Sequence, residues 1–128
     1  MRRSIFAALI AALLISGTAL AVPPAPSGTL TITSLDAQFG GAVTFSATTD
    51  NLKGYQYPLV YLACYQGATL VYGQLGLPTE TFILGGGSSD WWTSPGPADC
   101  EATLYAYPGF HAGDIVLLDG PLAFSAAG

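Results

Sequence analysis

Basic residues are almost missing from this chain. Lysine and arginine together number 3 among 128 residues, and two of them stand at positions 2 and 3, so Lys53 is the only basic residue left in the body of the chain. One lysine cannot form the positive patch that attracts phosphate groups, and the formal net charge is −5. The composition therefore argues against nucleic acid and anionic lipid as partners. The acidic residues are scattered, and we interpret them as charges that keep the protein soluble.

Histidine is equally scarce, because His111 is the only one. A metal site or catalytic dyad that needs two histidines is excluded, and no Gly-x-Ser-x-Gly sequence is present to place a nucleophilic serine beside His111 and Asp114. Asp99 and Glu101 flank Cys100 at a spacing that would suit calcium binding or glycoside hydrolysis, but we interpret them as a solvated strand face. We expect neither an enzyme nor a bound metal or cofactor.

No apolar run is long enough to span a membrane. The longest, residues 5–15, falls short of the ~20 residues that a bilayer requires, and it follows a pair of arginines. Ala19 and Ala21 then provide the small side chains that a signal peptidase accepts. This order predicts a secretory signal peptide over residues 1–21, a secreted mature protein without a membrane span, and a proline-rich lead-in over residues 22–28.

Cysteine is limited to Cys64 and Cys100. Neither lies in a Cys-x-x-Cys sequence or next to a histidine, so a metal or redox site is not supported. In an exported protein a single pair predicts one disulfide with one possible connectivity. That disulfide would close a loop of 36 residues. On the chain-entropy model it would stabilise the fold by roughly 3–4 kcal/mol.

Helical periodicity is absent as well. Glycine (16) and proline (9) recur throughout, and the runs between them alternate and favour β-branched and aromatic residues. The predicted strands cover residues 29–33, 43–48, 59–65, 68–75, 79–84 and 100–107, followed by a last strand over 115–118 and 122–125 that a bulge or bend interrupts. Seven or eight strands of this kind predict an all-β domain over residues 29–128, a two-sheet antiparallel sandwich. We expect the two cysteine strands to be central and to face each other across the core.

Two segments carry a family resemblance. Residues 64–67 (Cys-Tyr-Gln-Gly) and 98–105 (Ala-Asp-Cys-Glu-Ala-Thr-Leu-Tyr) resemble segments of small exported bacterial proteins with an immunoglobulin-like domain. The resemblance implies an immunoglobulin-like β-sandwich with one disulfide, and such a fold carries no function with it. Two features depart from antibody domains: the cysteines are only 36 positions apart, and Ala98 stands two residues before Cys100 in place of tyrosine. The resemblance therefore implies the architecture and not the antibody lineage.

Aromatic residues are the most suggestive feature that remains. Trp91 and Trp92 are adjacent, so one ring can seal the core while the other faces solvent. Tyr105 and Tyr107 fall on the outward phase of their strand. We identify these four residues as a candidate binding surface and expect residues 85–99 to form a binding loop. β-Propensity alone would also place tyrosines on strands, which is the alternative explanation.

Three functions fit these observations. The leading hypothesis is a secreted, non-enzymatic immunoglobulin-like module that binds a protein or another component of the cell envelope or surface. The alternative is a carbohydrate-binding module that stacks sugars on exposed tryptophan and tyrosine rings. A small secreted hydrolase using His111 and an acid is disfavoured. A row of exposed coplanar rings would favour sugar, whereas a flat apolar patch beside an unpaired strand edge would favour protein.

Overall fold

The computed structural model describes residues 25–55, 57–87, 92, 96–108 and 114–128. The predicted signal peptide and residues 22–24 of the lead-in lie outside these ranges. The elements follow one another as β1 (Ser27–Leu35), β2 (Ala42–Asp50), β3 (Tyr57–Gln66), β4 (Thr69–Gly76), β5 (Phe82–Ile83), the 3-10 turn η1 (Leu84–Gly87), β6 (Ala98–Tyr107) and β7 (Val116–Ala126). Within the described ranges no helix is long and apolar enough to cross a membrane. The prediction of an all-β fold is confirmed.

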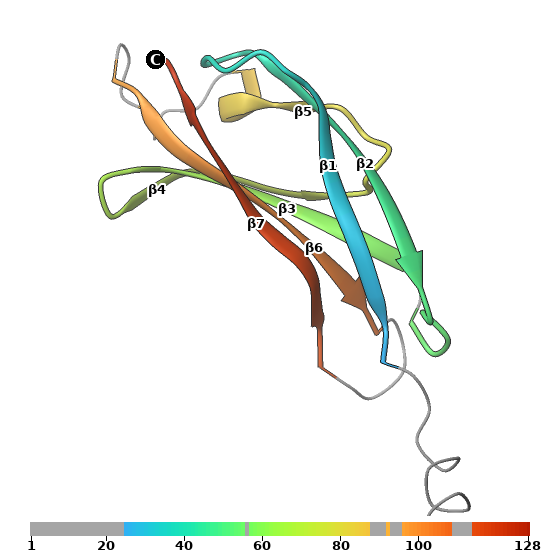
Figure 1. The fold of residues 1–128 in the computed structure, drawn as a ribbon. Coiled ribbons are helices and arrows are strands. Elements are labelled where there is room, and N and C mark those ends of the chain that lie inside the picture. Colours follow the sequence, from blue (N-terminus) through green and yellow to red (C-terminus); the bar gives the residue numbers. More distant parts are fainter. Residues whose placement is uncertain (1–24, 56, 88–91, 93–95, 109–113) are drawn as a thin grey trace, which may run out of the picture.

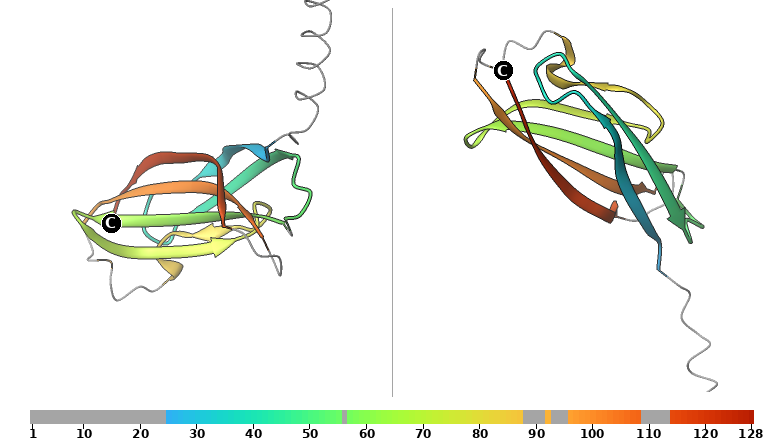
Figure 2. Two further views of the ribbon diagram at one scale, coloured as in Figure 1. Left: turned by 90° about the horizontal axis from the view of Figure 1, so that it is seen from below. Right: turned by 45° about the horizontal axis from the view of Figure 1, so that its top comes forward.

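The strands form two antiparallel sheets that face each other as two layers (Figures 1 and 2). One has the order β1-β2-β5 and the other the order β4-β3-β6-β7. The alternation of the strands directs one set of side chains between the layers, where Phe45 of β2 meets Phe82 of β5 edge-to-face at 5.3 Å between ring centroids. Val60 and Leu104 enter the same core from the opposite sheet. The predicted two-sheet sandwich is therefore confirmed.

The strand boundaries follow the prediction closely except at two places. β1 begins at Ser27, inside the predicted lead-in, because Ser27 is still in register with Asp50 at the end of β2. The predicted strand over residues 79–84 is wrong for most of its length, since only Phe82–Ile83 pairs with β2 before η1 begins. Gly85 and Gly86 adopt positive φ angles of 76° and 65°, a conformation incompatible with a strand.

The last strand is one element interrupted by a bulge, as predicted. Its register against β6 shifts on both sides of the pair Leu104–Asp119. Gly120 sits in the shifted segment with φ +101°, and a Cβ there would come within 2.8 Å of the carbonyl oxygen of Ala102. Glycine is therefore required at this position, where the backbone of β7 lies close to the backbone of β6.

The disulfide forms, but it joins two strands of one sheet and does not cross the core. Cys64 of β3 and Cys100 of β6 are register partners on neighbouring strands of the same sheet, with 4.0 Å between their Cα atoms. The prediction that the two cysteines face each other across the core is wrong. Both side chains do point into the core, at exposures of 0% and 2%. The disulfide therefore fastens two adjacent strands and leaves the attachment of the sheets to packing.

Candidate functional site

Tyr105 and Tyr107 lie on the outer face of the four-stranded sheet. Their neighbours on β6, Leu104 and Ala106, are both 0% exposed and face the core, so the two tyrosines face away from it. Tyr107 is in register with Tyr57 of β3, and the two rings stack with their centroids 5.9 Å apart. The predicted outward phase of these tyrosines is confirmed.

A shallow groove of about 380 Å³ contains both tyrosines. Its lining residues come from β3, β4, β6 and the residue directly before β7, and are Leu59, Tyr61, Leu75, Tyr105, Tyr107 and Ile115. We call this set the outer-face groove. None of its side chains carries a charge at neutral pH, and two of them, Leu75 and Ile115, are each 57% exposed.

The other four lining residues of the groove cannot be identified from single strands, because the register between strands brings them together. Tyr61 of β3 pairs with Leu75 of β4 on one side and with Thr103 of β6 on the other. Gly73 gives Tyr61 its space, since a Cβ on Gly73 would lie 2.8 Å from the Tyr61 hydroxyl oxygen. Thr103 also falls on the outer face but is buried, so it forms part of the floor beneath these side chains.

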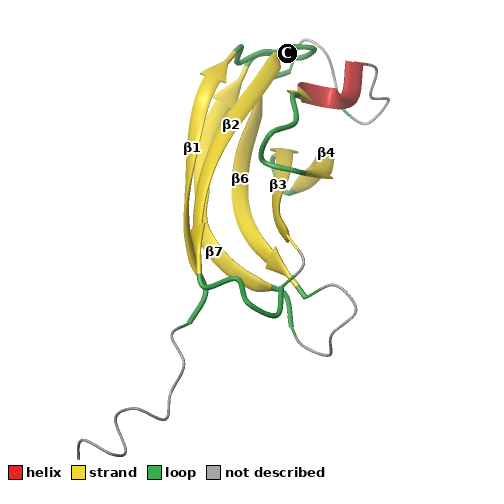
Figure 3. Ribbon diagram, turned by 90° about the vertical axis from the view of Figure 1, so that its right-hand side faces the viewer, coloured by secondary structure: helices red, strands yellow, loops and turns green. Residues whose placement is uncertain are grey.

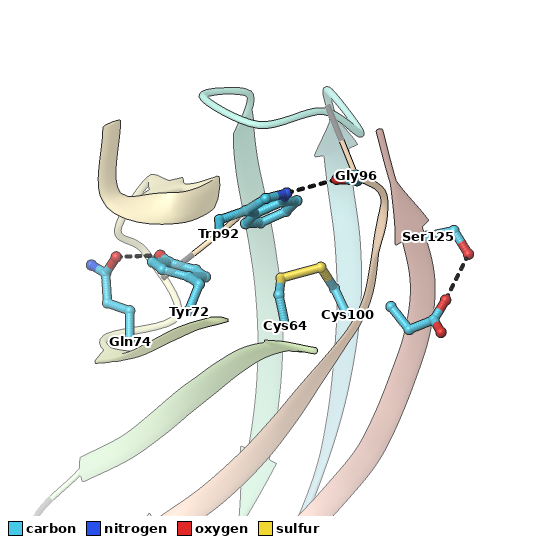
Figure 4. Close-up of a disulfide and its surroundings, with 8 residues drawn as sticks. Cys64, Tyr72, Gln74, Trp92, Gly96, Cys100 and Ser125 are labelled. Atoms are coloured by element: carbon cyan, nitrogen blue, oxygen red, sulfur yellow. Dashed lines mark hydrogen bonds between the residues drawn. A yellow bond between two sulfur atoms is a disulfide. The ribbon is translucent and has the colours of Figure 1, made fainter. Parts of the chain in front are cut away.

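Trp92 belongs to the core and not to the outer face. The residue is 4% exposed, and its indole N–H donates a hydrogen bond to the carbonyl oxygen of Gly96 at 3.0 Å. Its ring meets Phe39 edge-on at 5.4 Å and lies over the disulfide (Figure 4). Of the two adjacent tryptophans, Trp92 is therefore a buried one. Trp91 lies outside the described residues, as do residues 88–90 and 93–95 of the predicted binding loop.

The acidic candidates do not converge on a centre. Asp99 is exposed and accepts a hydrogen bond from the Ser125 hydroxyl at 3.3 Å, and Glu101 is half-buried on the same outer face. Asp114 is exposed, whereas His111 lies outside the described residues. Among the residues that the structure describes, no three His, Cys, Asp or Glu side chains are grouped to hold a metal ion.

Burial shifts the pKa of Tyr72 on β4. It lies on the inward face of β4 at 9% exposure, and its hydroxyl donates to Gln74 Oε1 at 2.5 Å (Figure 4). Burial disfavours the phenolate and raises the pKa of Tyr72 to about 12. The residue faces the core on the other side of the sheet from the outer-face groove, so its shifted pKa gives that groove no acid or base.

No protein-family model, no curated protein and no solved structure matches this chain. The resemblance to immunoglobulin-like exported proteins therefore stays a prediction.

Proposed function

We propose that the protein is an exported, non-enzymatic immunoglobulin-like module that binds another protein through the outer face of its four-stranded sheet. One observation carries this proposal. Of the seven large apolar side chains that are exposed in the described residues, four lie on strands of that sheet, and a fifth, Ile115, directly precedes β7 and lines the outer-face groove. These five are Tyr57, Leu70, Leu75, Ile115 and Leu117.

Such a concentration is costly in water. Soluble monomers rarely expose a contiguous apolar patch of several hundred Å² unless it serves an interaction. Each exposed leucine or isoleucine that a partner covers contributes roughly 1.5–3 kcal/mol when it is fully buried. The two remaining exposed side chains are Leu35 at the end of β1 and Leu77 directly after β4, and neither lines the outer-face groove.

The chemistry of the outer-face groove favours protein over carbohydrate. A sugar platform needs free ring faces, but Tyr57 and Tyr107 stack on each other and Trp92 is buried. The most exposed lining groups are instead the aliphatic side chains of Leu75 and Ile115. Apart from tyrosine hydroxyls, the lining offers no acid, base or nucleophile, which supports a binding role.

Two further observations support the rest of the proposal. The orders β1-β2-β5 and β4-β3-β6-β7 are compatible with an immunoglobulin-like sandwich. The disulfide supports export, because such bonds form and persist mainly outside the cytosol.

A matched pair of variants tests the binding surface. Leu75→Glu places a charge in the outer-face groove, whereas Leu35→Glu places one on an exposed strand residue outside it. The immobilised mature domain and both variants are exposed to envelope and host protein fractions and to a glycan array. We expect one protein to be retained by the wild type and by Leu35→Glu and to be lost from Leu75→Glu.

Three results would contradict the proposal. Retention that both variants lose equally, or no retention at all, would contradict the outer face as a protein-binding surface. Saturable glycan binding that Leu75→Glu abolishes would show a carbohydrate-binding module instead. A hydrolytic activity that His111→Ala abolishes would show that the protein is an enzyme.

A further inference from the structure

The two flanks of the sandwich are not alike. Along one flank β1 and β7 run close together, and a carboxylate oxygen of Asp119 accepts a hydrogen bond from the Leu30 N–H at 2.7 Å (Figures 1 and 3). A parallel bridge between Gln38 and Ala127 continues this contact. On the other flank the neighbour of β2 is β5, which has only 2 residues.

The shortness of β5 leaves an edge of β2 uncovered. β5 pairs with Ala42 and Val43, and from Thr44 to Asp50 the described residues pair with β2 only from the β1 side. Alternate residues of an antiparallel strand direct their N–H and C=O groups to opposite edges. The second edge of this stretch therefore presents a regular row of backbone donors and acceptors, a template for another strand.

A groove of about 420 Å³ runs beside this edge. Its lining residues come from β2, from β3 and from the segment between β4 and β5, and are Phe45, Ser46, Ala47, Thr49, Pro58, Leu77, Pro78 and Thr79. We call this set the flank groove. No lining side chain is charged, and Phe45, only 7% exposed, connects the groove with the core between the sheets.

The pairing of an open edge with an apolar groove selects one kind of occupant. An extended segment can hydrogen-bond to β2 while every second side chain enters the groove, as in known cases of strand addition. A bound helix or a small apolar molecule would fill the groove and leave the β2 backbone groups without protein partners.

The charged residues near the flank groove indicate which kind of extended segment fits it. Asp50 at the end of β2 and Glu80 beside Thr79 are both exposed, and Lys53 is the only basic residue that the structure describes. Two exposed carboxylates next to residues of an uncharged groove complement a segment that is apolar in its centre and basic at its ends. None of the strands in the described residues has basic ends, so they do not supply that segment from a second copy.

We propose that the flank groove accepts an extended, centrally apolar and terminally basic segment of a different protein, which adds as a strand to the Thr44–Asp50 edge of β2. The site is separate from the outer-face groove. The added segment extends the three-stranded sheet along the part of β2 that β5 does not reach.

The test uses synthetic peptides and the oxidised mature chain. Each peptide alternates threonine with one apolar residue (valine, leucine or phenylalanine) between two pairs of lysines, and fluorescence anisotropy measures its binding. We expect saturable binding of at least one peptide. Thr79→Trp, which fills the mouth of the flank groove, should weaken it about tenfold or more. Thr81→Trp alters an exposed threonine of the same loop outside the lining and should bind normally.

Two peptide controls test the backbone pairing and the charge. Methylation of alternate backbone nitrogens should abolish binding, because it removes the N–H groups that pair with β2. Glutamates in place of the terminal lysines should weaken it. Amide exchange in the complex should slow between Thr44 and Asp50.

The proposal is overturned if no peptide of the set binds, or if the methylated peptides bind as well as their parents. Protection of β4 (Thr69–Gly76) in place of β2 would place the added strand at the other sheet and would also overturn it. Leu75→Glu should leave peptide binding unchanged, so this result and the binding test of the outer face can fail independently.

Discussion

Trp92 shows how much one side chain contributes at the disulfide end of the sandwich. Its ring fills the space over the two cysteines. Its indole N–H donates to the carbonyl oxygen of Gly96, two residues before β6 begins at Ala98. A buried indole that is both packed and hydrogen-bonded fixes the approach of the chain to β6.

We predict that Trp92→Ala lowers the free energy of unfolding by about 3–5 kcal/mol, the usual cost of removing a buried aromatic ring. Trp92→Phe keeps most of the ring, loses the bond to Gly96 and should cost less. Denaturation with urea, monitored by far-ultraviolet circular dichroism, measures both. A loss below about 1 kcal/mol for Trp92→Ala would show that the ring is not part of the core.

Tyr72 makes the free energy of unfolding depend on pH in the alkaline range. Its pKa is about 12 in the folded protein against 10.0 for an ordinary tyrosine, so the folded state holds the phenolic proton more tightly. The stabilising contribution is complete below pH 10 and is lost as the pH rises toward and through 12.

The free energy of unfolding of the wild type should therefore fall across this interval by more than that of Tyr72→Phe, which has no proton to lose. Chemical denaturation at a series of pH values gives both curves, and their difference isolates Tyr72 from the other tyrosines. Two curves that stay parallel above pH 10 would contradict the assignment.

At the scale of elements, alternation in the sequence predicts which side chains face the core and does not predict which strands are neighbours. Leu30, Val43 and Phe45 are buried as their alternation requires. Cys64 and Cys100 are also correctly inward, yet they lie side by side on β3 and β6 because strand order depends on contacts between distant segments.

The same limit applies to the outer-face groove. The outward phase of Tyr105 and Tyr107 follows from their own strand, but their neighbours depend on the register with β3 and β4. The failed strand over residues 79–84 has a local cause. A turn in which the Glu80 N–H donates to the Leu77 carbonyl oxygen at 3.0 Å occupies its start, and Gly85 and Gly86 take the chain into positive φ directly after Leu84.

The disulfide should resist reduction while the two strands stay folded. Both sulfur-bearing residues are at most 2% exposed, so a thiol reagent reaches them only when β3 and β6 separate. We expect intact mass under denaturing, non-reducing conditions to show two hydrogens fewer than the free-thiol chain. Dithiothreitol should reduce the native protein far more slowly than the protein in guanidinium. Rapid alkylation of free thiols in the freshly purified native protein would contradict this placement.

At the scale of the whole molecule, the carboxylate of Asp119 joins β7 to β1 along the closed flank of the sandwich. Asp119 accepts hydrogen bonds from the Leu30 N–H of β1 at 2.7 Å and from the Gly120 N–H at 2.9 Å. In the sequence Asp119 is one of the scattered acids that we interpret as solubilising charges, but the β7 bulge turns it toward β1.

Asp119→Ala should lower the free energy of unfolding by about 1–3 kcal/mol, because a half-buried backbone donor on β1 loses its charged partner. Asp119→Asn keeps an amide oxygen that can accept from Leu30, so its loss should be smaller. Asp114→Ala removes the same charge from an exposed position near the start of β7 and should change stability by no more than about 0.5 kcal/mol. Equal effects of the two alanine variants, measured by urea denaturation at one ionic strength, would mean that net charge and not the β1–β7 link determines the result. A larger effect at Asp119 would show that the molecule depends on this link to hold one flank closed while the other stays open beside β2.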